Sequence, residues 1–269
     1  MKSETNIILE KIKIEVNIKT GKNIKSFKST FLERRILHRM RIVGITDYEE
    51  YLKLISTSLN EVNELYSALS INVTKFFRDP QVWGKLESEI IPNLTNKSNT
   101  HSIQVWSCGS ASGEEPYSIG ILLNEVLKSR GIKFEIFAND ISLEAITRSK
   151  KGIYRKANLV NVKEDKIFRY FEKIEDEQYQ IKPTITSQIK FENTDMLKIT
   201  KKQFDIIFCR NVLIYYDRNL HEVIFEKFAN SLKDNGILIL GQDESMVGTY
   251  GSKYFTTIYP KERIYQKTV

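Results

Sequence analysis

Residues 103–118 read Ile103-Gln-Val-Trp-Ser-Cys-Gly-Ser-Ala-Ser-Gly-Glu-Glu-Pro-Tyr-Ser118, a short apolar run, a turn of small residues and a helix start in direct succession. The small side chains between Gly109 and Gly113 allow the backbone to turn sharply and a ligand to approach the main chain. Pro116 suits the first turn of a helix, where its missing N–H costs nothing. The stretch therefore predicts the strand, loop and helix with which doubly wound folds bind nucleotides.

Carboxylates near this turn restrict the ligand. Glu114 and Glu115 would repel a pyrophosphate at the helix N-terminus, where phosphate sites present N–H groups. Acidic residues in a first turn also simply favour the helix dipole, and for Glu114 the two interpretations stand equal. A second apolar run, residues 134–139, ends in Asp140, where Rossmann-like units bind ribose hydroxyls. Together these residues predict a cationic nucleoside without phosphate, and S-adenosylmethionine, which carries a sulfonium, fits.

The length and composition fit a globular protein of one large domain or two smaller ones. No apolar run approaches the ~18 residues that a membrane-spanning helix needs. The N-terminus alternates Ile with Lys and lacks the uninterrupted apolar core of a signal peptide. We therefore expect a cytoplasmic protein that is not inserted in a membrane.

The cysteines, histidines and net charge limit the chemistry further. Cys108 and Cys209 lie beside the ends of apolar strand-like runs, which in a cytosolic protein predicts buried thiols rather than a disulfide. Neither they nor His38, His101 and His221 show metal-ligand spacing, so no metal site is expected. The net charge of +7 permits a nucleic acid or an acidic protein as partner and does not choose between them.

The first third of the chain is helical in pattern, and one of its helices is strongly basic. Leu32, Ile36, Met40 and Val43 share one face of a helical wheel. The other face carries Arg34, Arg35, His38, Arg39 and Arg41. This face is either a solvated surface or a docking surface for an acidic partner, since crowded like charges repel unless something offsets them.

The rest of the chain alternates strands with helices. Strand-like runs lie near residues 103–107, 134–139, 189–192, 204–209 and 236–241, and the last segment, 254–266, favours a closing antiparallel pair. This alternation predicts an α/β fold with a mostly parallel sheet, and seven strands ending this way are typical of the Rossmann-like S-adenosylmethionine-dependent methyltransferases. We predict an all-α N-terminal domain at 1–75, a linker helix and linker at 76–101, and the methyltransferase domain at 102–269, with a small β excursion at about 171–192.

The loop after the strand at 204–209 reads Arg210-Asn-Val-Leu-Ile-Tyr-Tyr-Asp217. It would lie at the carboxyl end of the sheet, where α/β proteins bind ligands. Methyltransferases that modify nucleic-acid bases usually place here a proline-containing motif that ends in an aromatic residue and stacks a flipped base. This loop has no proline, so we expect no nucleic-acid partner.

Four motifs follow one another along the chain. They are Asn72-x-Thr74-x-Phe76-Phe77-Arg78, the stretch from Ser107 to Ser118, Ala138-Asn139-Asp140-Ile141, and the run from Phe208 through Arg210-Asn211 to Asp217. In this order they resemble the CheR-type chemotaxis receptor glutamate methyltransferases, over about residues 25–267. The resemblance implies methyl transfer from S-adenosylmethionine to receptor glutamates in sensory adaptation, with S-adenosylhomocysteine as product.

The resemblance also implies roles for single residues. The cofactor's amino-acid and sulfonium end would lie against Asn72, Thr74 and Arg78, its amino group on Glu115, its ribose on Asp140 and its adenine beside Asp195 and Met196, with Gly109, Arg210 and Asn211 as further cofactor contacts. Arg78 would orient the incoming carboxylate and Tyr215 would shape the methyl channel, which makes these two the predicted catalytic residues. The basic helix, from Arg34 to Arg41, would dock on the cytoplasmic helical bundle of the receptor.

Two departures from the family pattern stand out. Asp195 and Met196 occupy the place of an Asn-Leu pair, and Gly241-Gln242-Asp243-Glu244 stands where the family commonly shows Gly-His-Ser-Glu. The missing histidine argues against an acid-base role at this strand end. Some family members bind a receptor's C-terminal peptide through a longer, glycine-containing β excursion, whereas residues 172–191 contain no glycine. We therefore predict no binding of such a peptide.

Two other functions stay open on the sequence. A methyltransferase of RNA or of a small molecule is favoured by the basic helix and opposed by the proline-free loop. A non-catalytic module that senses the cofactor would keep the same fold, and the apparently complete set of cofactor residues argues against it.

Overall fold

The computed structural model describes residues 2–21, 24–70, 74–96, 101–200, 203–246 and 248–268. Contacts divide the chain into two compact units. The helical unit comprises Met1–Ile71 and Tyr215–Leu220, and the α/β unit comprises Asn72–Ile214 and His221–Val269. Within the described residues, every helix is too short or too polar to span a bilayer.

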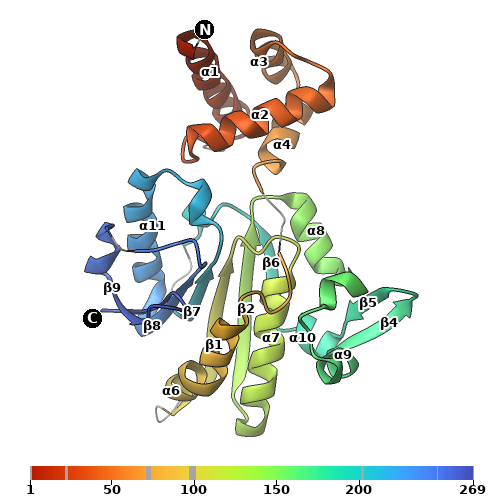
Figure 1. Cartoon of the computed structure of the whole chain (residues 1–269), viewed down its shortest axis with the longest axis vertical. Helices are drawn as coiled ribbons and strands as arrows, with labels where there is room; N and C mark the ends of the chain where they lie inside the picture. The colour runs from red at the N-terminus through yellow and green to blue at the C-terminus, as the bar shows by residue number, and fades with distance from the viewer. Residues whose placement is uncertain are drawn as a thin grey trace. The chain divides into compact units, whose positions relative to one another are not determined.

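The helical unit consists mainly of short amphipathic helices (Figure 1). They are α1 (Lys2–Thr20), α2 (Ser29–Val43), α3 (Tyr48–Thr57) and α4 (Leu59–Ser67). The side chain of Asp47 caps α3 by accepting the N–H groups of Glu49 and Glu50, and Gly44 ends α2 with a φ of +75°. α2 buries Leu32, Ile36 and Met40, as its apolar stripe predicts.

The segment Tyr215–Leu220 belongs to the helical unit although it lies far along the chain. Tyr216 forms an isolated antiparallel bridge with Phe27, and the two rings stack with centroids 4.7 Å apart. The N–H of Lys28 donates to the carbonyl of Tyr215 at 2.9 Å. These contacts fix the segment on the turn that precedes α2.

A seven-stranded sheet forms the centre of the α/β unit, in the order β6-β2-β1-β7-β8-β10-β9 within the described residues. The strands from β6 to β8 run parallel, while β10 is antiparallel to both β8 and β9. Its strands are β1 (Ser102–Cys108), β2 (Lys133–Asp140), β6 (Ile189–Asn193), β7 (Phe204–Cys209), β8 (Leu232–Leu240), β9 (Phe255–Tyr259) and β10 (Ile264–Lys267). The predicted Rossmann-like methyltransferase sheet with a closing antiparallel pair is confirmed.

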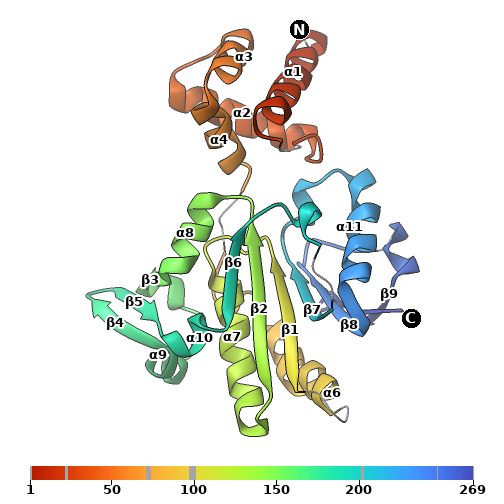
Figure 2. The ribbon, with the colours of Figure 1, turned by 180° about the vertical axis from the view of Figure 1, so that it is seen from behind.

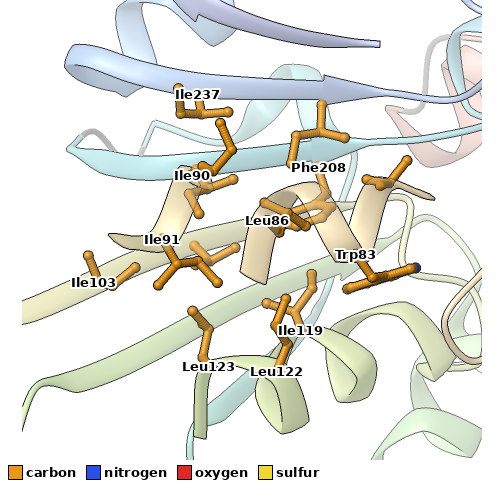
Figure 3. Close-up of a cluster of buried hydrophobic side chains, with 14 of the residues drawn as sticks. Trp83, Leu86, Ile90, Ile91, Ile103, Ile119, Leu122, Leu123, Phe208 and Ile237 are labelled. Atoms are coloured by element: carbon orange, nitrogen blue, oxygen red, sulfur yellow. The ribbon is translucent and has the colours of Figure 1, made fainter. Parts of the chain in front are cut away.

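Helices cover both faces of this sheet. The helices that follow the helical unit in the chain are α5 (Pro80–Lys85), α6 (Ile91–Thr95), α7 (Glu114–Leu127), α8 (Leu143–Lys151), α9 (Glu164–Tyr170), α10 (Pro183–Thr186) and α11 (Arg218–Ser231), of which α9 lies against β4 of the small sheet described below. A π-helical turn, Leu86–Ile90, joins α5 to α6, and its Leu86 packs with Leu122 of α7 and Phe208 of β7 (Figure 3). On the opposite face, Trp106 of β1 meets Phe228 of α11 edge to face at 5.4 Å. The site described below lies at the carboxyl ends of these parallel strands.

A second, three-stranded sheet lies beyond the β6 edge, on the side of the α/β unit away from β9 (Figures 1 and 2). It consists of β3 (Ile153–Arg155), β5 (Gln178–Ile181) and β4 (Phe171–Glu175), in that order. Phe76 packs edge to face against Tyr154 and Phe171 and thereby ties the segment before α5 to the small sheet. The predicted β excursion is present, and β3 is a strand that the sequence pattern did not indicate.

Candidate active site

The turn between β1 and α7 requires glycine at its first position. Gly109 has a φ of +69°, and a Cβ placed on it would come within 2.5 Å of Cγ2 of Val212. Gly113, with a φ of +98°, faces the hydroxyl of Tyr154, which a Cβ would approach to 2.8 Å. Glycine at both ends therefore lets the turn pack closely against Val212 and Tyr154, which fixes the course of its main chain.

Asp140 ends β2 and organises the same turn. One of its carboxylate oxygens accepts the N–H of Ala111 at 2.9 Å, and the other accepts the N–H of Ser142 at 2.8 Å. These bonds orient the Asp140 carboxylate at the edge of the turn. The position at the end of the second strand is the one where Rossmann-like units hold a ribose.

Arg210, directly after β7, connects three segments of the α/β unit. Its Nη2 donates to Oδ2 of Asp79 at 2.6 Å and to the carbonyl oxygen of Arg78 at 3.0 Å. Its Nη1 lies 3.3 Å from Oε2 of Glu115. The Arg210 side chain is only 2% exposed, and a buried guanidinium bonded in this way fixes its partners firmly. The sequence motifs around Arg78, Glu115 and Arg210 therefore meet at one place.

Glu115 combines a buried carboxylate with an opening to solvent. Ser107 donates its hydroxyl to Oε1 of Glu115 at 2.8 Å, and the side chain is 13% exposed. Burial raises the pKa of Glu115, while the charge of Arg210 opposes that rise. An ammonium group would satisfy this carboxylate further, because the ionised form of Glu115 gains most from a second cation.

The segment that carries Arg78 is held in a strained conformation. Phe77 and Asp79 have φ angles of +47° and +56°, which side-chain-bearing residues rarely adopt. Trp83 donates its Nε1–H to the carbonyl of Arg78 at 2.7 Å, and the N–H of Phe77 donates to the hydroxyl of Ser118 at 2.9 Å. Such strain persists only where surrounding contacts over-determine the backbone, so the position of Arg78 is fixed from several sides.

Asp195 and Met196 lie after β6 in a short 3₁₀ turn. The Asp195 carboxylate accepts the N–H of Leu197 at 2.9 Å, and burial raises the pKa of Asp195. Met196 is buried, with its sulfur 3.3 Å from Sγ of Cys108 at the end of β1. The pair is thereby anchored beside the first strand of the sheet. Cys108 and Cys209 are both buried free thiols, as predicted.

The remaining predicted cofactor residues differ in what the structure says of them. Asn211 lies next to Arg210 with a φ of +59°, and its N–H donates to Glu244 at 2.9 Å. Thr74 is half-buried in the α/β unit. Asn72 lies outside the described residues.

The predicted docking residues of α2 fall into two groups. Arg34, His38 and Arg41 are exposed. Arg39 is 11% exposed and bonds Glu61 of α4 through Nε at 3.0 Å and Nη2 at 2.7 Å. Arg35 is half-buried, with its guanidinium carbon 5.4 Å from the ring centroid of Phe31.

Tyr215, the second predicted catalytic residue, is part of the helical unit. Its ring packs against Phe31 of α2 with centroids 4.8 Å apart. In the chain it directly follows Ile214, the last residue of the loop that Arg210 begins. The peptide bond between Ile214 and Tyr215 is therefore one of the points at which the chain passes from the α/β unit to the helical unit.

Sequence reasoning missed several residues that organise the site. Asp79, Ser107 and Trp83 support Arg210, Glu115 and Arg78, respectively. Asp79 directly follows the Arg78 motif, which was a usable signal. Glu244 accepts backbone N–H groups from the loop after β7, and its sequence signal was its match to the glutamate of the family pattern Gly-His-Ser-Glu, just beyond β8.

Two buried atoms indicate that the site accepts a ligand. Four buried side-chain atoms of the described residues have no hydrogen-bond partner, and two of them, Ser110 Oγ in the glycine turn and Arg210 Nε, lie at this site; the others are Arg35 Nε and Gln242 Nε2. Buried polar atoms are nearly always bonded, so such atoms mark where a ligand or water binds. A carboxylate at Glu115 for an ammonium group and one at Asp140 for ribose hydroxyls complete a donor and acceptor set that fits S-adenosylmethionine.

The sheet order, the glycine turn and these two carboxylates define an S-adenosylmethionine-dependent methyltransferase, and S-adenosylmethionine is its cofactor. Two family profiles match the chain: "CheR methyltransferase, all-alpha domain" at residues 8–70 and "CheR methyltransferase, SAM binding domain" at residues 72–260. The protein belongs to the CheR methyltransferase family, as the order of its motifs indicates.

Curated relatives are named as chemotaxis methyltransferases. A "Chemotaxis protein methyltransferase" of Borreliella burgdorferi is 30% identical over 244 residues, covering 87% of this chain and 86% of the relative. One of Listeria innocua is 32% identical over 229 residues, covering 84% and 86%. Among solved structures, magnesium protoporphyrin IX methyltransferase from Synechocystis PCC 6803 with bound SAM is 12% identical, with a TM-score of 0.39 over 86% of this chain and 95% of that one.

Proposed function

We propose that the protein transfers the methyl group of S-adenosylmethionine to glutamate side chains of chemotaxis receptors, forming methyl esters and S-adenosylhomocysteine. The observation that carries the proposal is the set of three hydrogen bonds made by the Arg210 guanidinium. They bring the Arg78 backbone and the Glu115 carboxylate together at the carboxyl end of the sheet. Glu115, the proposed cofactor-binding acid, thereby lies near the backbone of Arg78, the proposed carboxylate-binding residue. The names of the relatives support chemotaxis as its setting.

For cofactor binding we assign roles to residues at and near the turn after β1. Glu115 holds the amino group, Asp140 the ribose, and Asp195 and Met196 flank the adenine, while Gly109 lets the turn beside the cofactor pack under Val212. Asn72, Thr74, Arg78, Arg210 and Asn211 complete the set. When bound, the cofactor supplies an electrophilic methyl group on a sulfonium.

Catalysis on a glutamate needs placement more than proton transfer. A glutamate with a pKa of about 4.3 is already ionised at neutral pH, so attack needs no strong general base. Arg78 offers a planar, two-pronged cation that matches a carboxylate, from a backbone fixed by Trp83 and Arg210. Tyr215 shapes the methyl channel. Alignment and exclusion of water supply ~7–11 kcal/mol of the barrier in well-oriented reactions.

The receptor's cytoplasmic helical bundle docks on α2. Its unmethylated glutamates are anions that complement the exposed guanidinium groups of Arg34 and Arg41, with the exposed His38 beside them, and such complementarity raises the rate of encounter. Arg35 and Arg39 contribute less, because their side chains pack within the helical unit. That the small sheet binds no receptor tail peptide stays a prediction.

The decisive experiment uses methyl-labelled S-adenosylmethionine with membranes that contain the cognate receptors, followed by mild alkali. Label that enters receptor protein and leaves as methanol identifies a carboxyl methyl ester, since methylated amines and bases survive this treatment. Transfer of label into RNA, or cofactor binding without base-labile transfer, would reject the proposal.

The role of Arg78 is tested by Arg78→Ala, with Arg130→Ala as the control. We expect the Arg78 variant to lose at least about 100-fold in turnover because the carboxylate is no longer oriented, as is usual when an orienting contact is removed. Arg130, which donates to Thr95 at 2.7 Å at the far end of α7, should tolerate the change. Equal turnover in both variants would exclude the role assigned to Arg78.

A further inference from the structure

We propose that Glu244 is a positioning residue: its carboxylate gathers the backbone of residues 211–214 and thereby holds Arg210 and Val212 where the cofactor binds. The proposal deepens the proposed function and rests on it for one point, that this loop borders the cofactor. Glu244 lies after β8, in the segment that departs from the family pattern at Gln242 and Asp243, and no role was predicted for Glu244 itself.

The carboxylate of Glu244 accepts N–H groups from two segments. Oε1 accepts from Val212 at 2.8 Å, Leu213 at 2.6 Å and Ile214 at 3.3 Å. Oε2 accepts from Asn211 at 2.9 Å and Gly241 at 2.7 Å. The residue is 4% exposed. Successive N–H groups that converge in this way form an anion-binding nest, and here the anion is a side chain of the same protein.

The loop transmits this anchoring to the ligand site by direct contact. Val212 covers Gly109, because a Cβ placed on that glycine would lie 2.5 Å from Cγ2 of Val212. Arg210 immediately precedes the anchored residues and holds Asp79 and Glu115. A shift of this loop would therefore displace both the cover of the glycine turn and the partner of Glu115.

The anchoring depends on a group that only accepts hydrogen bonds. A glutamine at position 244 has the same size, but its NH₂ group would replace one of the two carboxylate oxygens. That NH₂ group would then face the backbone N–H groups that the oxygen accepts, donor against donor. Gly241 shows how tightly the nest is packed, because a Cβ there would lie 2.7 Å from the nitrogen of Asn211 and 2.8 Å from Oε2 of Glu244. Burial raises the pKa of Glu244, while the N–H donors oppose that rise.

The test compares Glu244→Gln with Asp205→Asn. Asp205 is also buried, at 9% exposure, and also accepts a backbone N–H, from Gln104 at 2.8 Å, but it sits at the opposite end of β7 beside Lys233. Calorimetric titration with S-adenosylhomocysteine well below each variant's Tm should show Kd raised at least about tenfold for Glu244→Gln, as when a buried donor loses its acceptor. We expect a change below about twofold for Asp205→Asn, whatever its loss of Tm.

Hydrogen exchange separates local release of the loop from general loosening. The amides of residues 211–214 should exchange faster in Glu244→Gln than in the wild type, and at the wild-type rate in Asp205→Asn. Unaltered Kd in Glu244→Gln, or equal losses in both variants, would overturn the proposal. Binding of S-adenosylhomocysteine does not involve the receptor, so the two proposals fail in different ways. If the positioning role of Glu244 is wrong, Kd in Glu244→Gln is unaltered. If the proposed reaction is wrong, the wild-type protein still binds S-adenosylhomocysteine but shows no base-labile transfer.

Discussion

Arg39 and Arg210 are both nearly buried arginines with two carboxylate partners, and they lie in different units of the molecule. Arg39 bonds Glu61 and Glu64 and thereby ties α2 to α4. Arg210 bonds Asp79 and Glu115, and also the carbonyl of Arg78. Both were singled out from sequence as functional residues, one for docking and one for the cofactor.

The two networks differ in whether they are complete. Glu61 is 4% exposed and also accepts the hydroxyl of Tyr51 at 2.8 Å, so this buried carboxylate has its partners within the helical unit, and the other partner of Arg39, Glu64, is 52% exposed to solvent. In the Arg210 network Glu115 retains an opening, and Arg210 Nε has no partner among the described residues. A closed buried network specifies structure, whereas an open one has capacity for a ligand.

The largest effect should follow from Arg210→Met. This change leaves Glu115 and Asp79 without their cation, and breaking a buried pair from one side costs about 3–5 kcal/mol. We expect binding of S-adenosylhomocysteine to weaken by more than about 100-fold and turnover to disappear, because both the Glu115 carboxylate and the Arg78 backbone lose their support. Calorimetry and the transfer assay measure the two quantities.

Arg39→Met is the matched variant in the helical unit. The substitution should lower the free energy of unfolding by about 3 kcal/mol, since the Glu61 carboxylate keeps only its bond to Tyr51. A cofactor Kd that changed as strongly as in Arg210→Met would contradict the comparison between the two arginines. The cofactor Kd should stay within about twofold of wild type, because no partner of Arg39 belongs to the α/β unit. Urea unfolding followed by circular dichroism measures the first and calorimetry the second.

Local patterns predicted the architecture well because each decisive element carried its own signal. The small-residue turn at Gly109, the carboxylate at the end of β2 and the alternation of strands and helices each follow from backbone sterics and periodicity. Burial of Ile36 and Met40 in α2 follows equally from helical spacing.

Pairings between distant residues were beyond such patterns. No spacing reveals that Arg39 meets Glu61, that Arg210 meets Asp79, or that Glu244 accepts five backbone N–H groups, since these depend on how elements pack. β3 escaped because three residues are too few for a period of two to be visible. Sequence charge therefore identified the basic helix but not which of its arginines are committed internally.

The exposed charges of α2 should give a smaller, salt-dependent effect. Replacing Arg34 and Arg41 with glutamine should raise KM for receptor about three- to tenfold at low salt, and less at high salt, because screening weakens attraction between exposed charges. Tm and kcat should not change, since both side chains are exposed. Arg39→Gln is the control: if it raised KM without lowering stability, Arg39 would belong to the docking surface after all.

The smallest expected effect is a pH dependence of cofactor affinity, which tests whether the Arg210 network is open at Glu115. Burial raises the pKa of Glu115 above its usual value, against the opposing charge of Arg210. Below that raised pKa the carboxylate is protonated and no longer attracts an ammonium group, so Kd for S-adenosylhomocysteine should rise about two- to threefold between pH 7.5 and pH 5.5. The free energy of unfolding of the ligand-free protein should instead increase as pH falls, because the folded state, in which the pKa of Glu115 is raised, takes up the proton more readily than the unfolded state. Glu115→Gln should bind more weakly throughout and lose this dependence; a variant that kept the wild-type slope would place the titrating group elsewhere.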